Sequence, residues 1–410
     1  LLNTIIGADV AYSSKSRFLT KIIDALPFLE TKEISNITAY GEFAKIFPHN
    51  HKSQGNQRGV SNLEDFENAE LSNDLKNVSN WVVAAIPQKQ EDLFPDTKTY
   101  DKFSWMNHHA ALSFYTIDQL FYRDNDMPDN IKQRVDNILS DPFQRQVDQR
   151  DLFPQRNFPQ GTPTILPTLD LFFRPTERGM YNFNSSPSEI NDKGELLNPQ
   201  LSWAGITRKI DQNDFEAANI DYIEIWMHDP MANNPNLKGE LLLHLGNVSE
   251  DILPDRRKSF ENGLPTSASS NTETDTTQYA IVPSGPQINF AFDNNAATLK
   301  SQDLGLDGMN DQQEVVHFDS SLLKKIAANF GAGSKYYVDA VSDPSNDNFV
   351  HYLENVYDGL DADIIGRYAK FQGHQGNSNN EQYTGNYAGM PKSSTPIPSV
   401  EDVNRDFTLN

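Results

Sequence analysis

A twelve-residue segment from Asp303 to Glu314 carries acidic residues at the spacing of a calcium-binding loop. Counted from Asp303, carboxylates stand at positions 1, 5, 9 and 12, and a glycine stands at position 6, where such loops turn sharply. The predicted ligands are Asp303, Asp307, Met309 through its backbone carbonyl, Asp311 and Glu314. Because Ca²⁺ takes about six to eight oxygen ligands, the segment predicts a calcium site with a structural role.

The segment departs from the calcium-loop pattern at two points. Position 3 is Gly305, where Asp or Asn is usual, so we expect a water molecule to replace that ligand. Residues 315–318 are expected to be extended, and a helix with Leu322, Leu323, Ile326 and Phe330 on its apolar side is predicted to begin only near Asp319. The alternative to ion binding is an Asp-Gly turn whose acidic side chains face water.

Catalytic residues are weakly indicated elsewhere in the chain. Glu224 stands among aromatic residues, but no second acid stands at a recognisable spacing from it, as a glycosidase would need. His108 and His109 are adjacent, and neighbouring helix positions point about 100° apart, which makes them poor joint metal ligands. The motifs of a serine hydrolase, a phosphate-binding loop and a zinc protease are absent from the sequence. We therefore predict no enzyme activity.

Composition narrows the classes of partner and of chemistry. The chain has 34 basic and 57 acidic residues and a net charge of −23, which argues against nucleic acid or an anionic membrane surface as a partner. It contains no cysteine, so disulfides, thiolate metal sites and cysteine nucleophiles are excluded. No apolar run long enough for a membrane helix and no signal-peptide pattern is present. A start without methionine is expected of a fragment of a longer protein.

Alternating apolar residues give the densest strand signal between Trp203 and Pro265. Residues 219–227 and 239–246 are predicted to pair as the central strands of a sheet. Further strands are predicted at 37–47, 81–87, 169–173, 279–282 and 288–292, and helices at 14–26, 110–121 and 128–138. The helix at 14–26 is expected to pack in a core.

These elements predict a mainly β fold, with a jelly-roll-like β-sandwich interrupted by a helical insertion. The expected division is an initial helix and strand over 1–59, the jelly-roll-like domain over 60–99 and 161–298, the helical insertion over 100–160, the calcium-type loop and a helix over 299–340, and a final segment with a flexible loop over 341–410. A jelly roll would suit a carbohydrate-binding module of a cell-surface protein, with Trp203 and Trp226 as a sugar-stacking platform. Core packing is the alternative for both tryptophans.

Several stretches of the sequence resemble one known family. Residues 214–224, followed by 249–255 and 261–265, resemble the SprA/Sov family, the giant outer-membrane translocons of the type IX secretion system and gliding-motility apparatus of Bacteroidetes. Further matches are 64–67, 115–118, 177–179, 302–308 and 400–406. The resemblance implies that this chain is an internal fragment and part of a large outer-membrane β-barrel protein.

The same resemblance implies a function. The chain would be a soluble portion of the translocon that shapes or caps the outer-membrane pore for cargo export. Its expected partners are secreted cargo proteins and other outer-membrane secretion subunits, with contact to the outer membrane made by the full-length protein. The expected location is the outer membrane, exposed to the cell surface or the periplasm.

Overall fold

The computed structural model divides the chain into two compact units. One comprises Leu1–Ser72 with Asp214–Tyr222, and the other Asn73–Asn213 with Ile223–Asn410. The structure describes residues 4–27, 33–47, 74–99, 103–211 and 214–409, the last range without 216–219, 221, 233, 235, 265–272, 286–289, 372–375, 379–381, 385–386, 389, 391 and 393–396. The predictions for 60–73, 267–272, 288–289 and most of 372–398 therefore lie outside the described residues.

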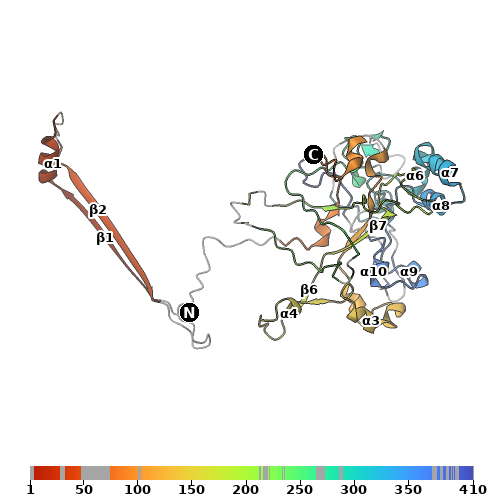
Figure 1. The fold of residues 1–410 in the computed structure, drawn as a ribbon, viewed down its shortest axis with the longest axis horizontal. Coiled ribbons are helices and arrows are strands. Elements are labelled where there is room, and N and C mark those ends of the chain that lie inside the picture. The colour runs from red at the N-terminus through yellow and green to blue at the C-terminus, as the bar shows by residue number, and fades with distance from the viewer. Residues whose placement is uncertain are drawn as a thin grey trace. The chain divides into compact units, whose positions relative to one another are not determined.

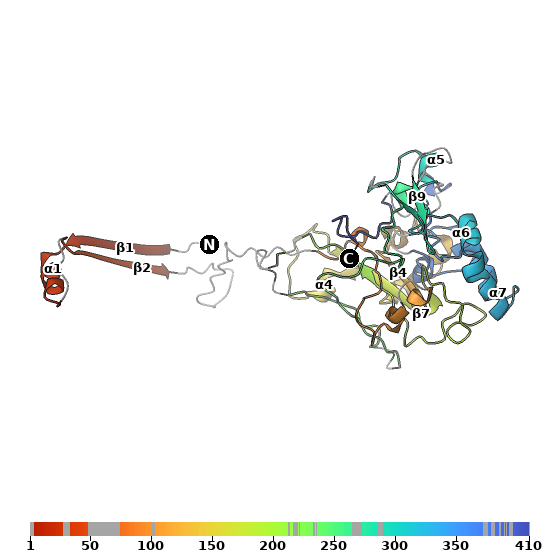
Figure 2. The ribbon, with the colours of Figure 1, turned by 90° about the horizontal axis from the view of Figure 1, so that it is seen from above.

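The first unit contains a long antiparallel ribbon and one helix. β1 (Thr4–Lys15) pairs with β2 (Asn36–Phe47) over its whole length, and α1 (Arg17–Asp24) lies between them in the chain (Figures 1 and 2). The Ser16 side chain caps α1 by accepting a hydrogen bond from the Leu19 amide. The predicted helix and strand are confirmed, but the expected core packing is wrong, because no described residue of α1 is buried.

The β1–β2 ribbon has one apolar face that the structure leaves exposed. Its register pairs Ala8 with Phe43, Val10 with Gly41 and Tyr12 with Ala39, whereas Asp9 pairs with Glu42 on the opposite face. Val10 is 66% exposed and Phe43 is 60% exposed. An isolated two-stranded ribbon is at best marginally stable in water, so burial within this ribbon contributes little to its stability.

The strands of the second unit form two-stranded antiparallel sheets. Its strands are β3 (Val82–Val83), β4 (Ala110–Tyr115), β5 (Val147–Asp148), β6 (Ile165–Leu166), β7 (Asp170–Arg178), β8 (Ile206–Thr207), β9 (Thr274–Thr276) and β10 (Ile281–Pro283). The antiparallel pairs are β3–β8, β4–β7, β5–β6 and β9–β10.

The expectation of a mainly β fold with a jelly-roll sandwich is wrong. The structure is 24% helical and 18% strand, and the strands in its described part form only two-stranded sheets, with neither a sandwich nor a barrel among them. The physical reason is that an alternating sequence sets which side chains share a face, but it does not supply a partner strand.

The stretch predicted to be the central sheet shows this most clearly. Residues 222–229 and 237–245 have no regular secondary structure, and residues 219 and 221 lie outside the described part. Ile225 is 50% exposed and Leu243 is 60% exposed, so the apolar residues that were expected inside a core face solvent. The predicted helix at 110–121 is wrong as well, because β4 occupies residues 110–115, with Phe114 and Tyr115 buried.

Short helices complete the second unit. They are α2 (Asp129–Lys132), α3 (Val135–Ser140), α4 (Gln149–Leu152), α5 (Ala296–Leu299), α6 (Asp311–His317), α7 (Lys324–Phe330), α8 (Lys335–Ser342), α9 (Asn355–Gly359) and α10 (Ile364–Arg367). A π-helical turn (Asp319–Leu323) joins α6 to α7, and α8 contacts both of these helices (Figure 1). No helix among the described residues is long and apolar enough to cross a membrane.

Two buried clusters form the core of the second unit. The larger joins β4 to the helical layer and contains Trp105, Phe114, Phe183, Phe318 and Leu322. The smaller includes Tyr115, Phe121, Ile131, Tyr352 and Tyr368, with the rings of Tyr115 and Tyr368 stacked 4.0 Å apart. The β4–β7 pair lies between these clusters, because Phe114 belongs to the first and Tyr115 to the second.

Candidate metal centre

Five carboxylates from two segments of the second unit gather into what we call the acidic centre. It consists of Asp307, Asp311, Glu314, Asp343 and Asp347. One oxygen each from Asp307, Glu314 and Asp347 lie within 4.8 Å of one another, and the same holds for Asp311, Glu314 and Asp343. Glu314 therefore belongs to both groups, and all the side chains offer oxygen, the donor that hard cations prefer.

The first segment is fixed by the start of α6. The Asn310 side chain accepts a hydrogen bond from the Gln313 amide and the Gln313 side chain accepts one from the Asn310 amide, which is a capping box. Because α6 begins at Asp311, Asp311 and Glu314 stand three residues apart on one face of the helix. The expectation that 315–318 would be extended is wrong, because 315–317 continue this helix.

The second segment is a turn that follows α8. The Asp347 amide donates to the Asp343 side chain over 3.1 Å, and Asn346 takes a positive φ of 55° between them. The buried Arg178 holds this turn by donating to the carbonyls of Pro344 and Asp343. The Asp343 carboxylate is thus held by a backbone amide of its own turn.

Ser345 joins the two segments directly. Its amide donates to Glu314 Oε2 over 3.0 Å, and its hydroxyl donates to Asp307 Oδ2 over 2.6 Å. The Met309 amide donates to the other oxygen of Asp307 over 2.9 Å. These contacts fix the carboxylates of Asp307 and Glu314 on either side of the same serine.

Tyr181 and Gly305 fix the position of Asp347. The Tyr181 hydroxyl donates to Asp347 Oδ2 over 3.2 Å and accepts from the Leu306 amide over 2.9 Å. Gly305 has a φ of +77°, and a Cβ atom built on it would lie 2.0 Å from Asp347 Oδ2. The carboxylate of Asp347 therefore occupies the space that a side chain at position 305 would need.

The deepest carboxylates of the centre are not fully satisfied. Asp307, Glu314 and Asp347 are 0% exposed, yet Glu314 Oε1 and Asp347 Oδ1 have no hydrogen-bond partner among the described residues. Within the same part of the chain, no Lys or Arg forms an ion pair with any member of the centre. Buried Glu401 differs, because the amides of Leu253 and Ser259 donate hydrogen bonds to its two oxygens, as is usual for a buried carboxylate.

Burial and repulsion between carboxylates raise the pKa values of Asp307, Asp311, Glu314 and Asp347. Burial raises the pKa of Asp307 to about 7, and burial together with the charge of Asp307 raises the pKa of Glu314 to about 10. Burial, then the charges of Glu314 and Asp307, raise the pKa of Asp347 well above its usual range. Burial also raises the pKa of Asp311. The charged forms are thus costly here unless a positive charge compensates them.

The structure brings together three of the five residues predicted as calcium ligands, Asp307, Asp311 and Glu314. Asp303 lies apart from the acidic centre: it accepts from the Ser378 amide over 3.0 Å, and its charge acts on buried Glu261. Met309 is 1% exposed and packs in the larger core cluster. Asp343 and Asp347 were missed, although the sequence Asp-Pro-Ser-Asn-Asp of this turn is a readable acidic turn signal.

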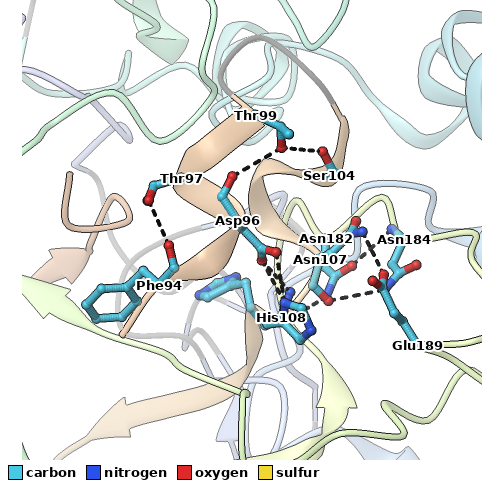
Figure 3. Close-up of polar contacts among 11 residues, drawn as sticks. Phe94, Asp96, Thr97, Thr99, Ser104, Asn107, His108, Asn182, Asn184 and Glu189 are labelled. Atoms are coloured by element: carbon cyan, nitrogen blue, oxygen red, sulfur yellow. Dashed lines mark hydrogen bonds and ion pairs between the residues drawn. The ribbon is translucent and has the colours of Figure 1, made fainter. Parts of the chain in front are cut away.

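The adjacent histidines have different hydrogen-bond partners, and Figure 3 shows His108 beside Asp96. His108 Nδ1 donates to both oxygens of Asp96, over 2.9 and 3.0 Å, because a carboxylate can only accept. This hydrogen bond to Asp96 raises the pKa of His108. His109 donates from Nδ1 to the Met180 carbonyl over 2.8 Å, and burial lowers its pKa to about 4. Their ring nitrogens are engaged with different partners.

The residues proposed for sugar stacking and acid chemistry are also separated from each other. Trp203 is partly buried against the larger core cluster, where it packs on Phe94 with ring centroids 5.7 Å apart. Trp226 is 59% exposed, and its indole nitrogen donates to Glu224 over 2.5 Å. Because the predicted sheet is absent from the described part of this stretch, the two tryptophans do not share a platform on it.

A comparison with protein families gives one match. Residues 322–410 match the profile of the SprA family, which is described as a motility related/secretion protein. The resemblance to the SprA family is confirmed for this part of the chain. The SprA-matched segment contains Asp343 and Asp347, whereas Asp307, Asp311 and Glu314 precede it. A search of curated proteins found no match. The family match associates the chain with secretion or motility and with the cell envelope.

Proposed function

We propose that this chain is a portion of the type IX secretion translocon of the outer membrane, which shapes or caps the pore for cargo export. The observation that carries the proposal is the SprA-family match over 322–410. The earlier resemblances at 214–224, 249–255 and 261–265 support it from outside that segment. The proposed partners are secreted cargo proteins and other secretion subunits, and the proposed action is binding rather than catalysis.

Exposed apolar side chains supply a surface for such protein contacts. In the second unit, Ile225, Trp226 and Met227 are between 50% and 61% exposed, and Leu241, Leu243 and Leu245 between 56% and 60%. Exposed apolar side chains that form a patch are typical of protein interaction sites. We assign the cargo or subunit contacts of the second unit to these two stretches, 225–227 and 241–245.

The test is co-purification of the full-length protein from detergent-solubilised outer membranes. An affinity tag inserted at Gly161 suits the structure, because Gly161 is exposed and no atom lies within 4 Å of a Cβ built there. We expect secreted cargo and other outer-membrane subunits to co-purify. Recovery as a soluble species that retains no cargo and binds polysaccharide would contradict the translocon proposal.

A pair of variants tests the assigned surface. Trp226→Asp places a charge on the assigned surface, whereas Leu360→Asp places one on a leucine that is 69% exposed and lies outside it. We expect Trp226→Asp to reduce the cargo that co-purifies and Leu360→Asp to leave it unchanged. Equal recovery with both variants would show that the contacts lie elsewhere.

A further inference from the structure

The acidic centre has the features of a cation site rather than those of a solvated cluster of acids. Three of its carboxylates are 0% exposed, and two of these three leave one oxygen without a hydrogen-bond partner among the described residues. An unpartnered buried carboxylate oxygen is costly. These oxygens, Glu314 Oε1 and Asp347 Oδ1, belong to carboxylates that converge within 4.8 Å.

The position of Asp347 explains why the local calcium-loop pattern is incomplete. Gly305 stands at the third position of that pattern, where a ligand side chain is usual. The structure places the Asp347 carboxylate against Gly305, so close that a Cβ atom at 305 would overlap it. The Asp347 carboxylate, from the turn after α8, thus lies beside Gly305, the position where the calcium loop has no ligand side chain.

We propose that one Ca²⁺ ion binds in the acidic centre and is held by Asp307, Glu314 and Asp347, three fully buried carboxylates that converge. Asp311 and Asp343 form a second group with Glu314 and add negative charge near the ion. This ligand set differs from the one that spacing predicts, because it leaves out Asp303, Met309 and Asp311 and adds Asp347 of the SprA-matched segment. It holds independently of the secretion proposal.

The chemistry of the donors selects the ion. All five side chains are carboxylates, so the site favours a hard divalent cation over zinc or copper, which prefer nitrogen or sulfur ligands. Ca²⁺ accepts irregular shells of about six to eight oxygens, whereas Mg²⁺ requires a near-octahedral shell and retains several waters. The three proposed ligands come from a turn (Asp307), a helix (Glu314) and a second turn (Asp347), and such an irregular set of ligands suits Ca²⁺.

Calorimetric titration of the 410-residue chain, first stripped with EDTA, tests the proposal with CaCl₂ and MgCl₂ as probes. We expect one Ca²⁺ to bind more tightly than Mg²⁺ and to raise the melting temperature. Asp347→Asn, which lies outside the calcium-loop pattern, is expected to weaken Ca²⁺ binding at least about tenfold, whereas Asp303→Asn changes it by less than about twofold. Absence of Ca²⁺ binding, or tighter Mg²⁺ binding, would overturn the proposal.

The two variants also separate the structural ligand set from the one that spacing predicts. Loss of binding in Asp303→Asn with binding kept in Asp347→Asn would place the ion in the local loop and overturn the proposed set. If Asp347→Asn does not fold, as judged by near-ultraviolet circular dichroism, Tb³⁺ luminescence in the unaltered chain decides. Because Tyr181 donates to Asp347, tyrosine-excited Tb³⁺ emission that Ca²⁺ displaces is expected, and its absence would contradict the site.

Discussion

The β1–β2 ribbon and the β4–β7 pair are both antiparallel two-stranded structures, but their surroundings differ. β1 and β2 pair over twelve residues each, and none of their described side chains is buried. β4 is only six residues long, yet Phe114 is 0% exposed and Tyr115 is 3% exposed. From this difference we expect the stability of each strand pair to depend on the side chains that cover it more than on the number of its backbone hydrogen bonds.

Hydrogen exchange should show the largest contrast between the two strand pairs. Backbone amides of 4–15 and 36–47 are expected to exchange at least about 100-fold faster than those of 110–115, because opening of an uncovered ribbon costs far less than opening of a buried strand. Peptide-level mass spectrometry of the isolated chain measures this. Equal protection would mean that the apolar face of the ribbon is covered in solution.

Truncation of a core aromatic should be the most destabilising substitution. Phe318 is 0% exposed and packs on Phe183 with ring centroids 4.6 Å apart. Phe318→Ala is expected to lower the free energy of unfolding of the second unit by about 3–5 kcal/mol in urea titrations. The matched change in the ribbon, Tyr40→Ala, removes a ring that is 82% exposed and should cost no more than about 0.5 kcal/mol. Similar losses of unfolding free energy in the two variants would contradict the difference between the core and the ribbon.

Two glycines give a smaller contrast of the same kind. Gly308 has a φ of +68°, and a Cβ there would lie 2.6 Å from the Ile281 carbonyl oxygen, whereas a Cβ on Gly41 meets no atom within 4 Å. Gly308→Ala is expected to cost about 2–4 kcal/mol through strain and overlap. Gly41→Ala should be neutral or stabilise the ribbon by up to about 1 kcal/mol. Thermal and urea unfolding of both variants would test this, and a tolerated Gly308→Ala would contradict the tight contact.

The His108–Asp96 pair predicts the smallest effect, a pH dependence confined to the second unit. Asp96 raises the pKa of His108 in the folded state. The stabilisation of the folded state by this pair is therefore fully present below the unfolded pKa of 6.5 and is lost as pH rises through the folded pKa. Asp96→Asn should therefore reduce the loss of stability between about pH 5.5 and about pH 8.5, roughly one unit below and two units above the unfolded pKa. NMR titration of His108 provides the direct control. An unchanged His108 titration curve in the variant would contradict the pairing.

Local sequence signals correctly predicted elements that depend on interactions between residues close in the sequence. The helix at 17–24 follows from its Ser16 cap, and β2 follows from its alternation of apolar residues. The start of α6 was also readable, because Asn310 and Gln313 form a capping box, but the β-branched Val315 and Val316 favoured a strand. The strand prediction for residues 222–245 was wrong. Apolar residues alternate clearly there, but the structure gives the described part of this stretch no partner strand.

Only part of the acidic centre could be predicted from the sequence, because some of its residues come together through tertiary packing. Residue spacing identifies Asp307, Asp311 and Glu314, because they lie within one short segment. Asp343 and Asp347 reach the centre through tertiary packing, with Arg178 and Ser345 fixing their turn. No local pattern contains that information, since it depends on how α8 returns the chain toward α6.

The way Ser345 bridges to Asp307 has a consequence for the order of folding. These two residues are 38 positions apart, so a ribosome that has completed the local loop has not yet produced the residues that finish the centre. A synthetic peptide of residues 303–314 would for the same reason lack Asp347 and should bind Ca²⁺ poorly. A calcium-loaded centre would mark a chain that has folded well beyond its α6 helix, so the ion would act late on the folding pathway rather than nucleate it.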